Sequence, residues 1–313
     1  MRKAALLYNP LSGRRRERRV KDVEAALAVL QEAGVEANAE PTLGPATAGD
    51  QAREAIAQGC DTILACGGDG TVNDVLQGMV GTDAALGVIP LGTANALAHD
   101  LRLPFSVAAS AHAALAGQRR RVAVGRVDYQ KFDGGSDSRY FTVAAGIGVD
   151  AHLFYKLNML LKGHLGMAAY YFQATRLWLT HRMQNFAVEI GGSCYEDVSQ
   201  LLAVRIRDFG GILRELAPGA SLESDDLRLV LFRTTSRAAY LRYIIRGLLA
   251  SKEEVKGIEL HSGGKVICRA PGQSAGPQRK IYVEADGELL GILPAEISVV
   301  PNALTMLVPA KTT

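Results

Sequence analysis

Cysteine is scarce in this sequence, with four residues among 313, at Cys60, Cys66, Cys194 and Cys268. No two of them stand at the CxxC spacing of a zinc or redox site, and they form no disulfide framework. A small number of scattered cysteines is typical of proteins in the reducing cytosol. We therefore expect a cytoplasmic protein.

Long hydrophobic runs are missing as well. No stretch reaches the roughly 18–20 apolar residues of a membrane-spanning helix. The apolar run near the start, Lys3–Tyr8, is too short for the hydrophobic region of a signal peptide. We therefore predict a first β-strand there.

An excess of one charge is also lacking, because the net charge is only +3. This balance does not call for a nucleic-acid partner, and none is predicted. Basic residues do cluster at Arg14–Arg19 and Arg119–Arg121. Such clusters suit anionic phosphates or lipid head groups, or they are solvated helix ends, and both readings stay open.

The first third of the chain alternates short apolar runs with helical periodicity, which is typical of βαβ units and a parallel sheet. Glycines follow several of these segments and indicate where they end. The predicted strands are Lys3–Tyr8, Thr62–Cys66 and Ala85–Pro90, and the predicted helices are Arg18–Ala33, Gln51–Gln58, Val72–Met79 and Ala94–Asp100.

After about residue 120 the pattern changes to many short strands separated by Gly, Asp and Ser turns, which favours an antiparallel β-sandwich. One long helical stretch, about 152–182, interrupts it. The predicted strands are Arg121–Tyr129, Tyr140–Ala145, Phe186–Ile190, Gln200–Arg207, Leu227–Arg233, Gly257–Ser262, Lys265–Arg269, Ile281–Ala285 and Ile297–Val300.

Three glycine-containing turns each follow a predicted strand and precede a helix. They are Asn9-Pro10-Leu11-Ser12-Gly13, Gly67-Gly68-Asp69-Gly70-Thr71 and Leu91-Gly92-Thr93-Ala94-Asn95. In a parallel sheet such turns meet at the carboxyl edge of the strands, where ligands bind. Glycine backbones and helix N-termini there suit a polyphosphate. A Walker A sequence is absent, which excludes a P-loop kinase.

A fourth glycine pattern, Gly146-Ile147-Gly148 followed by Ala151, resembles a dinucleotide fingerprint. That fold needs an acidic residue about 20 positions later to hold the ribose. No Asp or Glu occurs between Asp150 and Glu189. Hydride-transfer chemistry is therefore not expected.

The combination of NPxSG, GGDGT followed by Asn-Asp-Val, and PLGTAN resembles the diacylglycerol kinase catalytic family. That family includes soluble bacterial diacylglycerol kinases, YegS-like lipid kinases, and sphingosine and ceramide kinases. The resemblance implies an α/β nucleotide domain at 1–122, completed by the tail 295–313. It also implies a β-sandwich lipid-binding domain at 123–294, with the helical insertion at about 152–182.

The resemblance further implies two ligands, ATP and Mg²⁺. A set of residues would bind ATP: Asn9, Ser12, Gly13, Thr47, Gly67, Gly68, Asp69, Gly70, Thr71, Val72, Asn73, Gly92, Thr93, Asn95 and Glu288. Thr42 competes with Thr47 for one of these contacts. Leu222, Asp225 and Leu227 match the family's metal site, although Asp226 stands where the family has glycine.

Two aspartates are candidates for the catalytic carboxylate. By resemblance Asp286, in the hairpin Val283-Glu284-Ala285-Asp286-Gly287-Glu288, falls on the family's proton acceptor. Asp69 lies among the phosphate glycines, where a carboxylate more naturally orients Mg²⁺ or water. Without the family, the Asp-Gly pair also makes an ordinary hairpin turn.

The expected function is transfer of the γ-phosphate of ATP to a lipid hydroxyl at the inner face of a membrane. Basic and aromatic residues interleave in Leu153–Trp178, which suits peripheral membrane contact or a core helix. The lipid stays open among diacylglycerol, a sphingoid base, ceramide and phosphatidylglycerol, and so does the oligomeric state. The alternatives are an NAD kinase-like small-molecule kinase and an inactive nucleotide- or lipid-binding regulator.

Overall fold

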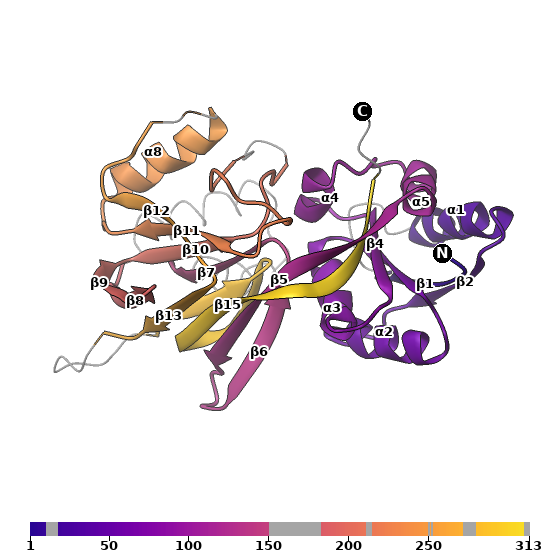
Figure 1. Ribbon diagram of the computed structural model, residues 1–313, viewed down its shortest axis with the longest axis horizontal. Coiled ribbons are helices and arrows are strands. Elements are labelled where there is room, and N and C mark those ends of the chain that lie inside the picture. Colours follow the sequence, from indigo (N-terminus) through magenta and orange to yellow (C-terminus); the bar gives the residue numbers. More distant parts are fainter. Residues whose placement is uncertain are drawn as a thin grey trace. The chain divides into compact units, whose positions relative to one another are not determined.

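The computed structural model describes residues 1–10, 18–149, 183–210, 215–249, 251, 253–271 and 280–309. The chain forms two compact units (Figure 1). The first contains Met1–Val124, Asp208–Ile212 and Val300–Thr313, and the second contains Gly125–Arg207 and Leu213–Val299. The predicted helical insertion at 152–182, together with Ser12 and Gly13, lies outside the described residues.

The first unit is a parallel sheet between two pairs of helices. Its strands run in the order β15, β4, β3, β1 and β2. They are β1 (Lys3–Tyr8), β2 (Glu36–Pro41), β3 (Thr62–Gly67), β4 (Ala85–Pro90) and the end of β15 (Glu288–Val308). Strands β3 and β4 are buried along their whole length, as expected of a parallel sheet that is covered on both faces.

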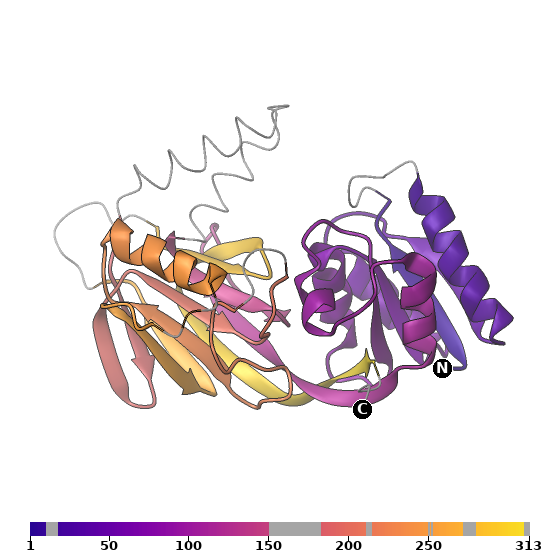
Figure 2. The same ribbon diagram turned by 90° about the horizontal axis from the view of Figure 1, so that it is seen from above.

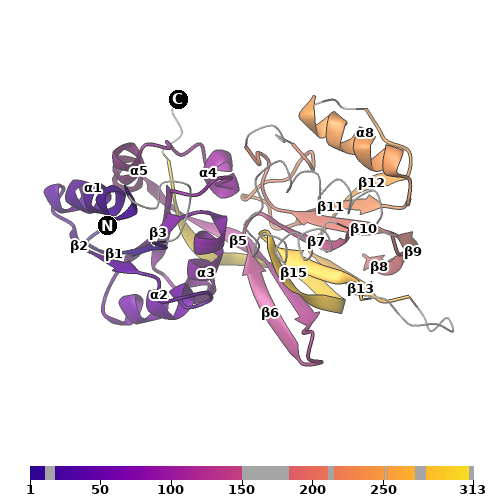
Figure 3. The ribbon, with the colours of Figure 1, turned by 180° about the vertical axis from the view of Figure 1, so that it is seen from behind.

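Helices α1 (Arg19–Glu32) and α5 (Val107–Leu115) pack together on one face of this sheet, and α2 (Ala48–Ala57) and α3 (Asp69–Met79) pack on the other (Figure 3). The core under α1 and α5 is aliphatic and includes Leu6, Leu30, Leu64 and Leu307. Helices α2 and α3 cross closely, since a Cβ atom on Gly78 would lie 2.0 Å from the carbonyl oxygen of Gly49.

The second unit is an antiparallel β-sandwich, as the strand pattern predicts. One layer has the order β12, β11, β10, β7, β14 and β15, and β13 and β8 extend from β15 in the other layer. The strands are β6 (Ser136–Phe141), β7 (Ala144–Gly148), β8 (Phe186–Ile190), β9 (Ser193–Val198), β10 (Gln200–Val204), β11 (Leu227–Phe232), β12 (Ile258–Gly263), β13 (Lys265–Arg269) and β14 (Tyr282–Ala285). Alternate residues such as Leu227, Leu229 and Leu231 point into one shared core.

Two strands belong to both units. Strand β5 (Gln118–Gln130) begins in the first unit and ends in the second, and β15 returns from the second to the first. The predicted boundary at 122/123 therefore falls inside a continuous strand, and the structure divides the chain after Val124. Because no linker separates the units, no change of composition marks the boundary.

A short segment starting at Asp208 also returns to the first unit, which the sequence reading missed. The Asp208 N–H donates to Asp100 Oδ1 at 3.0 Å. Gly210, with φ of +76°, lies so close to His99 that a Cβ atom would sit 2.1 Å from the imidazole ring. The segment thereby covers α4 (Ala96–Asp100), the helix that follows the PLGTAN turn.

The sequence reading also missed β2, α5, β9 and the helix α8 (Arg237–Leu248). No helix among the described residues combines the length and the apolarity that a membrane span requires. All four cysteines are free thiols. Burial raises the pKa of the Cys66 thiol to about 12.

Candidate active site

Two of the predicted glycine-rich turns touch each other at the carboxyl edge of the parallel sheet. The N–H of Leu91 donates to the carbonyl of Gly67 at 2.8 Å. A Cβ atom on Gly92 would lie 2.4 Å from the Cα of Gly68. Because only glycine permits this approach, the two turns form one continuous backbone surface.

The third turn reaches the same edge. Asn9 follows Tyr8, whose partner in the neighbouring strand β3 is Cys66, one residue before Gly67. The loop after β2 is also anchored here, since the Thr42 N–H donates to the Tyr8 carbonyl at 2.8 Å. Thr47 is the N-cap of α2, and its hydroxyl donates to the Gly44 carbonyl at 2.9 Å. Both threonines thus belong to one loop, and the geometry does not choose between them.

Helix α3 starts directly from the GGDGT turn, with Gly68 as its N-cap. The first N–H groups of a helix and its dipole favour a bound phosphate. The side chain of Thr71 lies beneath the turn, because a Cβ atom on Gly67 would sit 2.3 Å from Thr71 Oγ1. Thr71, Val72 and Asn73 are all buried, so their side chains support the turn from within.

Asp69 is the carboxylate of this turn. Its Oδ1 atom is buried and has no hydrogen-bond partner among the residues that the structure describes. A buried carboxylate oxygen without a donor is costly unless a cation or a donor comes to it. Asp69 therefore suits a site where a metal-bound nucleotide supplies the missing charge.

The PLGTAN turn is closed by its own asparagine. Asn95 Oδ1 accepts the Gly92 N–H at 2.9 Å, and Asn95 Nδ2 donates to the Gly92 carbonyl at 3.1 Å. Asn95 has a φ of +50°, a conformation that asparagine tolerates better than most residues. Thr93 is exposed at the tip of the turn, where it is free to meet a ligand.

Arg19 is a site residue that the sequence reading placed in a solvated or phosphate-facing cluster. Its side chain is only 3% exposed and lies 3.7 Å from Asp22. Its Nη2 donates to the carbonyl of Leu91 at 3.0 Å. Arg19 therefore positions the PLGTAN turn through its hydrogen bond to the Leu91 carbonyl.

The other basic cluster lies at the opposite edge of the sheet. Arg119 donates to the carbonyls of Asp61 and Asp83, which precede β3 and β4. Arg121 donates to the carbonyls of Thr82 and Asn302. These guanidinium groups stabilise the main chain at the amino-terminal ends of the strands. They are not near the glycine-rich turns at the carboxyl edge.

Asp286 lies in the turn between β14 and β15, with a left-handed φ of +48°. Its carboxylate accepts three main-chain N–H groups, from Thr142, Val143 and Ala144, at 2.9–3.1 Å. Three such donors fix the direction of the carboxylate and stabilise its ionised form. Glu288 follows in the same hairpin and pairs with Arg139 at 3.2 Å.

The glycines of the fourth pattern lie in β7, inside the antiparallel layer. A Cβ atom on Gly148 would lie 2.5 Å from the Ser199 carbonyl oxygen. Gly148 thus serves close strand packing.

The loop that was predicted to bind a metal ion already contains a positively charged side chain, Arg205. The guanidinium of Arg205 is fully buried and donates to the carbonyls of Leu222, Ser224 and Asp226 at 2.6–3.1 Å. Asp225 is exposed, and Leu227 starts β11. A divalent cation at these oxygens would face a positive charge at close range, so the loop does not fit the Mg²⁺ predicted at Leu222, Asp225 and Leu227. In the part of the chain that the structure describes, no three His, Cys, Asp or Glu side chains converge on one point.

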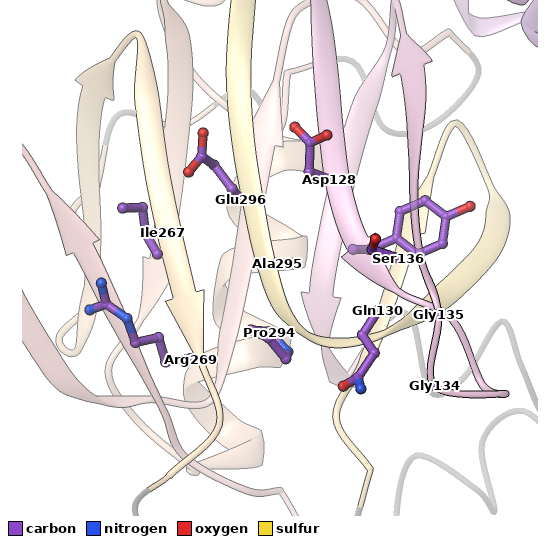
Figure 4. A pocket seen from close by; sticks show the side chains of 11 residues that line it. Asp128, Gln130, Gly134, Gly135, Ser136, Ile267, Arg269, Pro294, Ala295 and Glu296 are labelled. Atoms are coloured by element: carbon purple, nitrogen blue, oxygen red, sulfur yellow. The ribbon is translucent and has the colours of Figure 1, made fainter.

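An open cavity of about 540 Å³ lies elsewhere in the second unit, between β5, β13 and β15 (Figure 4). Its charged groups are already paired: Asp128 with Arg126, Glu296 with Lys265, and Arg269 with Glu189. None of the predicted site residues lines it. The cavity therefore belongs to neither candidate site.

The contact between the two glycine turns gives a first prediction. In Gly92→Ala the added methyl group must displace the Gly68 backbone, so we expect ATP to bind at least about tenfold more weakly. Gly264→Ala is the matched control, since a Cβ atom there meets nothing within 4 Å. Calorimetric titration with ATP measures both. Unchanged affinity in Gly92→Ala would show that these turns do not hold the phosphates.

A parallel α/β unit with glycine turns at its carboxyl edge, followed by an antiparallel sandwich, is the architecture of the NAD kinase and diacylglycerol kinase class of phosphotransferases. Two family models match. Residues 3–127 match the diacylglycerol kinase catalytic domain, and residues 142–308 match the YegS C-terminal NAD kinase beta sandwich-like domain. The chain belongs to the diacylglycerol kinase family, in the branch with a YegS-type second domain, and is accordingly a kinase.

Similar proteins and solved structures support this family assignment. The chain is 30% identical to a diacylglycerol kinase of Mycobacterium tuberculosis over 98% of its length and 95% of the relative. It is 29% identical to a diacylglycerol kinase of Bacillus subtilis, over 95% and 93%. A solved structure of a diacylglycerol kinase from Bacillus anthracis has the same fold, with a TM-score of 0.73, 19% identity, and coverage of 99% and 98%.

Proposed function

We propose that this protein transfers the γ-phosphate of ATP to the hydroxyl group of a membrane lipid. The observation that carries the proposal is the continuous backbone surface formed by Gly67, Gly68 and Gly92 in front of the N-terminus of α3. The names of its relatives add the lipid: the proteins of Mycobacterium tuberculosis and Bacillus subtilis are called diacylglycerol kinases.

In the proposed reaction, main-chain N–H groups of the glycine turns bind the triphosphate, and Asn9, Thr47, Thr93 and Asn95 are further contacts. Ser12 and Gly13, which the sequence also predicts as contacts, lie outside the described residues. Phosphoryl transfer depends mainly on positioning and on charge neutralisation. Asp69 would hold a Mg²⁺ ion, which shields the negative charge of the phosphates when it is bound. Asp69 Oδ1, which is buried and has no hydrogen-bond partner within the described part of the chain, supports this assignment.

We assign Asp286 as the proton acceptor for the lipid hydroxyl. The three N–H donors hold its carboxylate in a fixed direction, as the geometry of a general base requires. Glu288, in the same hairpin, is ion-paired with Arg139 and is proposed as a contact of ATP.

The test is transfer of label from γ-labelled ATP in mixed micelles that contain one lipid at a time: diacylglycerol, a sphingoid base, ceramide or phosphatidylglycerol. NAD is added in a parallel reaction. We expect organic-extractable label with at least one lipid and none on NAD. Label on NAD alone would support the small-molecule kinase alternative. ATP binding without any transfer would support the inactive regulator.

A further inference from the structure

We propose that the exposed apolar face of α8 is a membrane-docking surface for anionic lipid bilayers. The proposal rests on the proposed function, because a kinase for membrane lipids has to work at a bilayer. Helix α8 lies at the outside of the second unit, beside β11 and β12 (Figures 1 and 2). The face consists of Leu241, Ile244, Ile245, Leu248 and Leu249.

Helix α8 differs from an ordinary surface helix in having two apolar faces: Tyr240 and Tyr243 face the core, and a second, aliphatic face is exposed. An ordinary surface helix turns its apolar stripe to the core and its polar face to water. In α8 the aliphatic residues at positions 241, 244, 245 and 248 have the spacing of one helical face, and they are 37–50% exposed, while Leu249 at the C-cap is 73% exposed. An apolar face of this kind on a protein surface marks an interaction site.

The opposite face of α8 is firmly attached, so the outward orientation is fixed. The hydroxyl of Tyr240 lies 2.8 Å from Ser199 Oγ, and its ring lies 4.5 Å from that of Phe232. The hydroxyl of Tyr243 donates to the carbonyl of Leu216. Turning the aliphatic residues inward would break each of these contacts.

Composition favours a bilayer as the occupant of this face. Aromatic residues are enriched among the strongest contacts of protein interfaces, and leucine is under-represented there. The outward face of α8 presents only Leu and Ile among its large apolar side chains, and the aromatic residues of the helix point inward. Aliphatic side chains of this kind dissolve in lipid acyl chains, and a helix lying in the interface buries them by roughly 5–10 Å.

Charge and area lead to the same conclusion. Helix α8 carries three arginines, Arg237, Arg242 and Arg246, and no carboxylate of its own. Arg242 is paired with Glu253 of the following segment, and Arg246 lies over the ring of Tyr243. Arginines flanking an apolar face suit anionic head groups. Five partly exposed aliphatic side chains supply only roughly half of the about 800 Å² per partner that a stable protein dimer buries. A second copy of the chain is therefore the weaker candidate.

The test compares Ile245→Glu/Leu249→Glu with Leu43→Glu. Leu43 is 80% exposed and lies outside α8, so it is a matched control for an exposed aliphatic residue. Co-sedimentation is measured with vesicles of phosphatidylcholine alone and of phosphatidylcholine mixed with phosphatidylglycerol. We expect the parent and Leu43→Glu to bind the anionic vesicles equally. The α8 variant should bind them at least about tenfold more weakly, with an unchanged melting temperature.

The proposal fails if the α8 variant binds vesicles like the parent, or if the parent binds none. It also fails if light scattering shows that the substitutions turn a dimer into a monomer, because the face would then hold a second copy. Transfer to lipid in detergent micelles separates the two proposals. If the protein phosphorylates lipid but the α8 variant binds vesicles as well as the parent does, only the proposed docking surface is wrong. If the α8 variant loses vesicle binding but no lipid is phosphorylated, only the proposed lipid-kinase function is wrong.

Discussion

Asp286→Asn is expected to slow phosphate transfer by about 10²–10⁴-fold while Mg·ATP affinity stays close to that of the parent. The amide has nearly the size of the carboxylate but cannot take the hydroxyl proton. The expected loss therefore falls on the chemical step, and single-turnover transfer to a lipid acceptor measures it. Calorimetric titration with Mg·ATP measures the affinity.

The structure adds a second effect of this substitution. The carboxylate of Asp286 accepts three N–H groups, and an asparagine nitrogen accepts none, so some stability is lost as well. Melting curves are needed to ensure that the kinetics are measured on folded protein. Asp133→Asn is a matched control, because Asp133 also accepts a turn N–H, from Gly135 at 3.1 Å, in an exposed hairpin.

Asp69→Asn completes the comparison of the two aspartates. Its neighbours are the phosphate-facing glycines, so Mg·ATP binding should weaken along with turnover. Near-parental transfer by Asp286→Asn would make Asp286 a turn residue that only anchors the start of β7. Asp69 would then be the first residue to examine as the base.

Arg205→Met is expected to lower the free energy of unfolding by about 2–5 kcal/mol, because a buried polar group that is left without its hydrogen-bond partner costs about 1–3 kcal/mol. The substitution leaves the carbonyls of Leu222, Ser224 and Asp226 without their donor. Burial lowers the pKa of the Arg205 guanidinium, and the nearby charges of Asp226 and Asp225 act in the opposite direction. Thermal unfolding should show a fall of roughly 10 °C.

Arg207→Met is the control, because the Arg207 side chain is 74% exposed and its contact with Glu215, at 3.8 Å, is worth little. The same experiment tests the metal. The parent should melt at the same temperature in EDTA and in Mg²⁺ when no nucleotide is present. A clear rise with Mg²⁺ alone that persists in Asp69→Asn would restore the predicted site at Leu222, Asp225 and Leu227.

The order of the two folds could be predicted because each has its own local pattern. Buried runs such as Thr62–Gly67 and alternating runs such as Leu227–Phe232 differ in period, and glycine turns mark their ends. Strand β2, with the sequence EANAEP, has no β-branched residue, and it is held by pairing with β1 and by contacts with α1. Helix α8 was not predicted from the sequence. Its Leu and Ile residues are of the type that usually lies in a core, but in the structure they face outward.

The site was predictable where a motif is contiguous and unpredictable where it depends on distant partners. The glycine turns could be located from the sequence because their backbone conformation is local. The roles of Arg19 and Arg205 could not, since each acts on carbonyls far along the chain, at Leu91 and at Leu222. The three N–H groups that hold Asp286 come from residues more than 140 positions earlier.

The path of β15 has a consequence for how the chain folds during synthesis. Strand β4 is paired with β3 on one side and with Thr305–Met306 of β15 on the other. When the ribosome has made the first 124 residues, that second side of β4 is an open sheet edge, and Leu307 is missing from the core. The edge closes only after the whole sandwich has been translated. The nucleotide unit therefore finishes folding last although it is made first, and a nascent chain stalled before residue 300 carries an unprotected edge that is prone to aggregation.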